Sequence, residues 1–459
     1  MAAPRRVELE LRDVPYSAPR VTIDILPRIL SSKVGLIQQL QPGQYRAQDP
    51  AVLAMGVSSG DLARVAGIEN SPKAGGAGTD IETAIASTVG EAVERYCMYW
   101  FDRADFVTGT YNEFADDAVR PDMLRLYSEQ QVRETPPSVR LAYFGNDTRI
   151  SWVWAYSLTR SRPALVPASF VYLNYEPVDG ETLIGRNTST GLAAGATLEE
   201  AVLSGLTEVI ERDAFTISWL RRRVGPQIHI DDEALADEIA TRFMTDHPAV
   251  DLRIFDITLD IPVPCVLGIL RRPMEYGPAV CVASVTRTSP RGAIAKCVRE
   301  IGQGMPYMRY LRNQLADWEP ATDHSDVRTF DHHYTLYSKR PQLIERNLKF
   351  CNDAIRAVRL TDLPDVSTGR PLGDIKTLVR MLDAIGHEVL ALDITTPDVS
   401  DVGLRVVRVL VPGLVPLHGN HNFPYLGVER LHTVPAKLRW ADDGWEPSSS
   451  INPDPHPFP

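Results

Sequence analysis

Short apolar runs alternate with long amphipathic stretches along this chain. The apolar runs are rich in β-branched residues, which is typical of buried strands. The clearest are ISWVWAYSL (150–158), DLRIFDI (251–257), VPCVLGIL (263–270), GPAVCVASV (277–285), EVLALDIT (388–395) and LRVVRVLVP (404–412). Near the N-terminus, RVELELRD (6–13) and RVTIDIL (20–26) have the same character. We expect strands in all of these segments.

Three longer stretches repeat their apolar positions every three or four residues, which predicts helices. They cover residues 79–100, 197–222 and 290–303. Each begins with a capping signal: Thr79 with Glu82, Thr197 with Glu200, and Ser289 with Pro290. The third helix is expected to end before Pro306, because proline lacks the amide hydrogen that a helix interior needs.

Strands mixed with long helices predict an α/β (α+β) fold with mixed sheets. A chain of 459 residues has room for two or three domains, or for one large body with appendages. We predict a strand-bearing N-terminal segment (1–60), a core (61–330), a C-terminal α/β part (331–446) and a proline-rich tail (447–459).

The first two helices contain nearly the same phrase, STVGEAVERY (87–96) and SGLTEVIERD (204–213). At about 100° per residue, the serine and both glutamates of each phrase share one helix face. The shared positions are Ser87, Glu91, Glu94 and the adjacent Arg95 in the first helix, and Ser204, Glu208, Glu211 and the adjacent Arg212 in the second, where Glu200 joins the same face. The third helix places Lys296, Glu300 and Gln303 at the same i, i+4, i+7 spacing.

Two explanations of this polar stripe are open. It is either a solvated helix face or a binding site. Like charges three residues apart destabilise a helix unless a cation lies over them, and neither Glu94 nor Glu211 has a lysine or arginine four residues further on. Magnesium takes one or two carboxylates together with substrate phosphates. Glutamates from separate helices therefore predict a magnesium–nucleotide site.

Such a nucleotide site is not of the Walker type. The dipeptide Gly-Lys does not occur, so the glycine-rich phosphate loop G-x-x-x-x-G-K-[ST] is absent from this sequence. The nucleotide is therefore expected to be held by metal ions and side chains.

Composition narrows the choice of partner and compartment. The formal net charge of −11 argues against nucleic acid, because phosphate backbones need a basic footprint. Five cysteines without a C-x-x-C motif are typical of reduced thiols in a cytoplasm. The most apolar run (402–417) contains two arginines and two prolines, so it does not predict a membrane span. We expect a cytoplasmic protein with neither a nucleic acid nor a membrane partner.

The quoted phrases resemble the signatures of the YcaO family. AGGAGTDIETAIASTVGEAVERY (74–96) is similar to its first glycine-turn-helix block, and STGLAAGATLEEAVLSGLTEVIERDAF (189–215) is similar to its second. AIAKCVREIGQG (293–304) resembles its third helix, and VRVLVPGLVPL (407–417) with LGVERL (426–431) resembles its late strand and loop. The resemblance extends over roughly residues 30–459.

The resemblance implies a fold of the family's own and a cofactor pair of ATP and Mg²⁺. Carried over by position, the residues expected to bind the cofactor are Ser87, Glu91, Glu94, Arg95, Glu200, Ser204, Glu208, Glu211, Arg212, Lys296, Glu300 and Gln303. The four metal ligands among them would be Glu91, Glu94, Glu208 and Glu211. Two positions depart from the family pattern: Ala77 stands where a lysine is common, and Ala196 where an asparagine is common.

The last residues, PDPHPFP (453–459), alternate prolines and favour an extended polyproline II segment. A frayed tail is the ordinary interpretation of such an end. The segment also resembles the proline-rich C-terminus of YcaO cyclodehydratases that form azolines. By that resemblance the α-carboxylate of Pro459 is the expected catalytic base.

The resemblance implies ATP-dependent conversion of Cys, Ser or Thr residues of a ribosomal precursor peptide to thiazoline or oxazoline. The alternatives are thioamide or amidine formation, and a non-catalytic ATP-binding scaffold. We expect a precursor peptide and a separate E1-like protein that binds its leader as partners. A flavin dehydrogenase and a homodimer are further options. The histidines His332, His333, His418 and His421 are interpreted as structural.

Overall fold

The computed structural model describes residues 7–47, 49–60, 74–136, 139, 141–178, 180–185, 188–275, 277–352, 356–443 and 451–458. These residues form three sheets. The first is antiparallel, with the order β1 (Ile37–Pro42), β2 (Leu53–Ser59), β3 (Ala74–Gly78). The second has the order β11 (Gly277–Thr286), β10 (Cys265–Met274), β9 (Asp251–Asp256), β8 (Gln227–His229), β12 (Ala357–Arg359). Its strands are antiparallel except for β8 and β12, which are parallel.

The third sheet joins strands from both halves of the chain. Its order is β4 (Val107–Gly109), β5 (Ile150–Ser157), β13 (Leu390–Asp393), β14 (Arg405–Leu410), β7 (Leu192–Gly195), and β6 (Arg162–Pro167) also pairs with β5. All of its pairings are antiparallel. Strands from both sides of residue 330 thus share sheets, and the division of the chain into four parts stays a prediction.

Three long helices connect and cover these sheets: α4 (Ile81–Cys97), α7 (Leu198–Leu220) and α9 (Pro290–Gln314). The shorter helices are α1 (Arg20–Asp24), α2 (Leu26–Ile29), α5 (Tyr111–Phe114), α6 (Glu129–Glu134), α8 (Glu233–Phe243), α10 (Phe330–Lys339), α11 (Gln342–Asn347), α12 (Lys349–Asn352), α13 (Pro371–Ala384), α14 (Pro397–Asp401) and α15 (Arg430–Lys437). The mixed α+β fold with long helices that the sequence predicts is confirmed.

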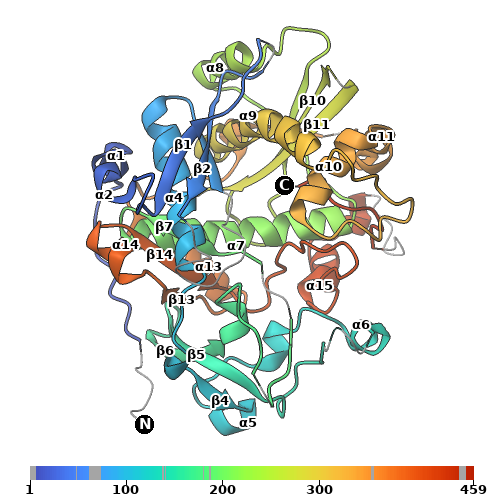
Figure 1. Ribbon diagram of the computed structural model, residues 1–459. Helices are drawn as coiled ribbons and strands as arrows, with labels where there is room; N and C mark the ends of the chain where they lie inside the picture. The colour runs from blue at the N-terminus through green and yellow to red at the C-terminus, as the bar shows by residue number, and fades with distance from the viewer. Residues whose placement is uncertain are drawn as a thin grey trace.

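The three long helices surround a common centre. Helix α7 runs through the middle of the molecule, below α9 in the view of Figure 1. Each pair of long helices packs against a shared strand: α4 and α9 against β3, α4 and α7 against β7, and α7 and α9 against β11. The polar faces that the sequence predicts on these helices are therefore held close together.

Two sequence expectations about helix ends are wrong. The cap of α4 is Asp80, whose carboxylate accepts a hydrogen bond from the amide of Thr83, and not Thr79. Helix α9 continues through Pro306 to Gln314. Proline in a helix interior costs about 3 kcal/mol. Here Pro306 is buried, and α9 packs along β10 and β11 on both sides of it, so tertiary packing outweighs the local penalty.

The N-terminal part also differs from the expectation. Residues 20–24 form helix α1, and no strand is assigned within described residues 7–13. Arg20 pairs with Asp24 at the i, i+4 spacing of a helix, and α1 packs against α4. Strand propensity measures how well a side chain fits a sheet surface, and here the neighbour is a helix.

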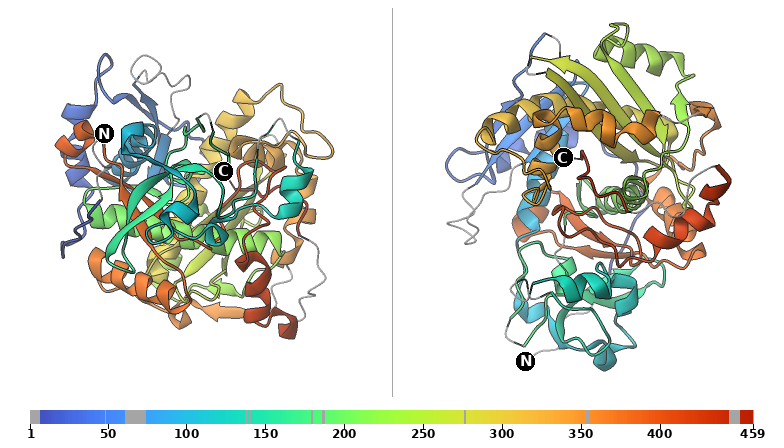
Figure 2. Two further views of the ribbon diagram at one scale, coloured as in Figure 1. Left: turned by 90° about the horizontal axis from the view of Figure 1, so that it is seen from below. Right: turned by 90° about the vertical axis from the view of Figure 1, so that its right-hand side faces the viewer.

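The proline-rich tail is not frayed over the described residues 451–458. The amide of Asn452 donates to the carbonyl of Leu220, and the indole of Trp219 donates to the carbonyl of Asp454. His456 and Phe458 are 0% and 5% exposed. Figure 2 shows this segment inside the molecule, beside α7. Within the described part of the chain, no helix is both long and apolar enough to cross a membrane.

Candidate functional site

The first carboxylate pair depends on the small residues of β3. A Cβ atom at Gly76 would lie 2.4 Å from the amide nitrogen of Thr88, so glycine lets β3 lie directly on α4. The amide of Gly75 then donates to Glu91 Oε2 at 3.2 Å. Arg95, one turn further along α4, lies 3.4 Å from Glu91 Oε1. The strand and the helix together fix this glutamate.

The second phrase builds the same arrangement on α7. The amide of Gly191 donates to Glu208 Oε2 at 3.3 Å, and Arg212 lies 3.4 Å from Glu208 Oε1. The glycine two residues before each helix cap is equally crowded. A Cβ at Gly78 would lie 2.3 Å from Ala84 N, and one at Gly195 would lie 2.5 Å from Ala201 N. The repeated phrase is therefore a repeated strand–helix unit.

Electrostatic coupling shows that the two units meet. Burial raises the pKa of Glu94 well above its usual value, and the charges of Glu208 and Glu91 raise it further while Arg95 opposes them. Burial likewise raises the pKa of Glu91, again with a contribution from Glu208. Glutamates from α4 and α7 thus lie within reach of each other's charge, as the sequence predicts.

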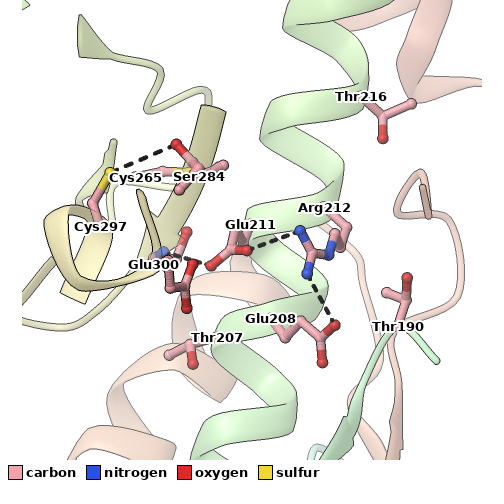
Figure 3. A network of polar contacts seen from close by, with 12 residues as sticks. Thr190, Thr207, Glu208, Glu211, Arg212, Thr216, Cys265, Ser284, Cys297 and Glu300 are labelled. Carbon is pink, nitrogen blue, oxygen red and sulfur yellow. Dashed lines mark hydrogen bonds and ion pairs between the residues drawn. The ribbon is translucent and has the colours of Figure 1, made fainter. Parts of the chain in front are cut away.

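Helix α9 contributes to the same cluster. Figure 3 shows Glu300 beside Glu211, with Arg212 between Glu211 and Glu208. The ammonium group of Lys296 lies 2.8 Å from Glu300 Oε1. The side chain of Gln303 lies near Gly75, within 3.6 Å of where a Cβ would stand.

Glu211 is the most enclosed of the four predicted metal ligands. Its Oε2 accepts a hydrogen bond from the amide of Thr286 at 2.9 Å, and its Oε1 lies 3.2 Å from Arg212. Burial raises its pKa to about 7; the charge of Arg212 opposes this shift, and that of Glu300 adds to it. At neutral pH this carboxyl group is therefore poised between its two protonation states.

The remaining predicted residues lie at the edge of the glutamate–arginine cluster. Ser87 is exposed and Ser204 half-buried on the faces that carry the glutamates. The carboxylate of Glu200 accepts a hydrogen bond from the amide of Ser17, at 2.5 Å, and so holds the N-terminal segment. Within the described ranges, no three Asp, Glu, His or Cys side chains are placed to hold a metal ion by themselves. Arg95 and Arg212 instead neutralise the neighbouring carboxylates.

Sequence reasoning missed Arg408 on β14. Its guanidinium is 2% exposed and donates to the carbonyl groups of Phe170 at 3.0 Å and Thr188 at 2.8 Å. Burial lowers its pKa to about 10, and the charges of Glu208 and Glu94 oppose the shift, so it faces both units. The sequence feature that could have identified it is an arginine inside an otherwise apolar strand. A charged side chain is buried only where a partner is present.

The tail reaches this cluster at Arg212. The ring of Phe458 lies 4.4 Å from the guanidinium carbon of Arg212. His456 stacks on His333 with ring centroids 3.8 Å apart. Pro459, the expected catalytic base, lies outside the described residues. Two cavities lie elsewhere, one of about 180 Å³ between α8 and α9 and one of about 390 Å³ beside α5.

Comparison with known proteins identifies the family. The family described as YcaO cyclodehydratase, ATP- and Mg²⁺-binding, matches residues 75–415 of this chain. The chain belongs to the YcaO family. The predicted cofactors, ATP and Mg²⁺, are therefore confirmed for the family.

Curated relatives of this YcaO chain carry no activity in their names. An uncharacterised protein of Methanothermobacter thermautotrophicus is 29% identical over 343 residues, which cover 74% of this chain and 80% of the relative. A second, described as an uncharacterised protein in the tfuA 3′ region of Rhizobium leguminosarum bv. trifolii, is 27% identical over 42% of this chain and 44% of that protein.

Solved structures share the YcaO fold. A heterocyclase in complex with substrate and cofactor superimposes with a TM-score of 0.79 at 24% identity. The superposition covers 98% of this chain and 60% of the heterocyclase, so the chain spans less than two thirds of that protein. YcaO from Methanopyrus kandleri, bound with AMPPCP and Mg²⁺, gives a TM-score of 0.61 at 21% identity and covers 87% of this chain and 91% of its own.

The residues present fit an Mg²⁺-bound triphosphate. Within the described part of the chain, no hydrogen bond is found to the carboxylate of Glu94, and Arg95 Nε is buried without a hydrogen-bond partner. A buried donor without a partner is costly unless a ligand satisfies it. The two departures, Ala77 and Ala196, lie next to the capped ends of α4 and α7, and both pack against apolar neighbours.

Proposed function

We propose that this protein is an ATP-dependent cyclodehydratase that converts Cys, Ser or Thr residues of a ribosomal precursor peptide to thiazolines or oxazolines. The observation that carries the proposal is that Glu91 and Glu94 on α4 lie within reach of the charge of Glu208 on α7, while Arg212 links Glu208 to Glu211. Family membership and the fold shared with heterocyclases support it.

Each group of side chains has a part in the proposed reaction. Glu91, Glu94, Glu208 and Glu211 would bind Mg²⁺, and Arg95, Arg212 and Lys296 would face the phosphates. When bound, Mg·ATP supplies a phosphoryl group that turns a poor leaving group, the amide oxygen, into a good one. Arg95 and Arg212, each paired with a glutamate one turn away, would stabilise the negative charge that develops.

The docked tail supports the choice of azoline formation over other YcaO reactions. Residues 451–458 run along α7 and end beside Arg212. Azoline formation needs a base at the reacting groups, and the α-carboxylate of Pro459 is the base that we propose. Thioamide or amidine formation remains the alternative within the family, and a non-catalytic ATP-binding scaffold is the alternative outside it.

The solved relatives also bear on the partner proteins that we propose. The solved heterocyclases are longer than this chain, which spans 60% of one and 56% of another. A further solved relative is the E. coli microcin synthetase McbBCD complex. We propose that a separate E1-like protein binds the leader of the precursor and presents it to this chain. A flavin dehydrogenase would act afterwards on the azolines.

Mass spectrometry of a candidate precursor tests the proposal. With the protein, its partner, Mg²⁺ and ATP, each ring should lower the peptide mass by one water. Glu208→Gln should abolish ring formation, whereas Glu233→Gln, an exposed glutamate on α8, should leave it unchanged. A peptide that gains sulfur, or that never loses water in any combination, would contradict azoline formation.

The role of Pro459 needs a separate variant. Deleting 455–459 would remove His456 and Phe458 from the core, so loss of activity would have two explanations. Adding two glycines after Pro459 moves the α-carboxylate and keeps those buried contacts. We expect this extension to block ring formation while ATP binding persists. Unchanged ring formation would exclude the carboxylate as the base.

A further inference from the structure

The C-terminal segment is fixed in place along its whole described length. The hydroxyl of Tyr337 donates to the carbonyl of Pro455 at 2.6 Å, and Asp454 pairs with Arg346 at 2.5 Å. His456 contacts the carbonyl of His418 through its Nε2 atom at 2.9 Å. A segment with this many contacts places its last described side chain, Phe458, at a defined position.

That position is the face of the Arg212 guanidinium. The Phe458 ring centroid lies 4.4 Å from the guanidinium carbon and 4.8 Å from the ring of Phe215, the next turn of α7. The donors of a guanidinium lie in its plane, while its two faces are open to stacking. The N–H groups at the edge of the Arg212 guanidinium pair with Glu208 and Glu211, and the Phe458 ring packs on its face.

The contact joins the C-terminal segment to Arg212, the side chain that the proposed function assigns to the phosphates. Arg212 is 19% exposed, and without the ring its long side chain could adopt other rotamers. A cation–π contact of a partly desolvated arginine is worth roughly 1–2 kcal/mol, enough to select one orientation. The contact is also the point where the tail and the nucleotide site touch.

We propose that Phe458 is a positioning residue that holds Arg212 in the orientation needed to bind the triphosphate, and so makes nucleotide binding depend on a docked tail. This inference rests on the assignment of Arg212 to the phosphates in the proposed function. It does not depend on which peptide is modified or on the role of Pro459. The alternative is that Phe458 only fills the core against Phe215.

The affinity for Mg·AMPPCP, measured by calorimetry on the full chain, separates these explanations without requiring turnover. Phe458→Leu keeps an apolar side chain but removes the π face, and we expect it to weaken binding by about three- to tenfold. Phe458→Tyr keeps the ring and should retain the wild-type affinity within about twofold. Glu233→Gln, on the exposed surface of α8, is the control and should leave the affinity unchanged.

A double-mutant cycle with Arg212→Gln tests the route of the effect. If Phe458 acts through Arg212, adding Phe458→Leu to Arg212→Gln should change the affinity by less than about twofold. Equal losses in both backgrounds, or wild-type affinity in Phe458→Leu, would overturn the proposal. Thermal unfolding checks that each variant is folded, and Phe458→Met, of similar volume and without a ring, replaces Phe458→Leu if that variant unfolds.

The same variants separate this inference from the proposed function. If the cycle shows coupling but no precursor loses water, the positioning role stands and azoline formation fails. If rings form and the cycle shows no coupling, azoline formation stands and the positioning role of Phe458 fails. In active protein, the KM for ATP should rise in Phe458→Leu by the same factor as the dissociation constant for Mg·AMPPCP, and Phe458→Tyr should rescue it.

Discussion

At the scale of single residues, the site glutamates differ in their surroundings. Glu91 and Glu208 each accept one amide hydrogen bond from a glycine, Gly75 in β3 and Gly191 just before β7, and each pairs with an arginine one turn away. Glu211 is enclosed more tightly, at 4% exposure. Identical side chains in nearly the same sequence phrase therefore have different surroundings.

Glu211 should make the stability of the protein without ligand fall as the pH rises. Its pKa is raised to about 7 by burial, whereas an unfolded glutamate ionises near 4.5. The stabilising contribution of the protonated form is complete below pH 4.5 and is lost as the pH rises through 7, by up to about 3 kcal/mol. The difference in unfolding free energy between the wild type and Glu211→Gln, measured by urea unfolding between pH 5 and 8, should show this slope. An equal slope in the variant would contradict the assignment.

Arg430 anchors α15 to α7 through a buried pair of aspartates. Its guanidinium lies 2.6 Å from Asp213 and 2.7 Å from Asp260, and all three side chains are almost fully buried. Arg430→Met leaves both carboxylates without this partner, so we expect a loss of about 3–5 kcal/mol in the free energy of unfolding. Lys437→Met removes a half-exposed partner of Asp260 and should cost less than about 1 kcal/mol. Similar losses in the two variants would show that burial does not decide the cost.

At the scale of elements, the repeated strand–helix unit depends on close approach of backbone to backbone. A Cβ at Gly205 on α7 would lie 2.8 Å from the carbonyl oxygen of Gly191 and 2.9 Å from the side chain of Val409 on β14. Gly90 on α4 has nothing within 4 Å of the same position. Two helical glycines at similar places in the two phrases thus have opposite environments.

Alanine at these two positions should act in opposite directions. Gly205→Ala forces α7 away from β14, and we expect a loss of about 1–3 kcal/mol in the free energy of unfolding. Gly90→Ala only restricts the unfolded chain and favours the helix, so a gain of about 0.5–1 kcal/mol is expected. Denaturant unfolding of both variants provides the measurement. A gain for Gly205→Ala would mean that the helix and the strand do not touch as described.

At the scale of the whole molecule, the C-terminal segment completes the interior. His333, His418 and His456 form a buried group in which the rings of His333 and His456 stack within 8° of parallel. His333 Nδ1–H donates a hydrogen bond to the carbonyl of His456 at 3.0 Å. His333 and His418 therefore hold His456 of the tail, in line with the structural role expected of His333 and His418.

Acid should weaken the packing of His456 against His333 and His418. Burial lowers the pKa of His456 to about 3, with Arg212 and His421 contributing, whereas an unfolded histidine ionises near 6.5. The stabilisation is present above pH 6.5 and is lost as the pH falls toward 3. The difference in unfolding free energy between the wild type and His456→Gln should therefore decrease as the pH falls from 7 to 4.5. A difference that stays constant would place the proton uptake elsewhere.

The sequence by itself determined the local elements and the chemical grouping of the site. Periodicity predicts α4 and α7, the late strands β13 and β14, and the polar face that each long helix carries, because these features depend on residues a few positions apart. The family follows from the same short phrases. Metal binding by Glu91, Glu94, Glu208 and Glu211 stays a prediction.

Only the tertiary structure decided which of the predicted helices and strands form as expected and which side chains meet at the site. Packing on β10 and β11 extends α9 through Pro306, and contact with α4 makes residues 20–24 helical. Arg408 and Phe458 enter the site from strands and tail far away in the sequence. These outcomes depend on burial and charge contributed by distant segments, and a local pattern carries no information about them.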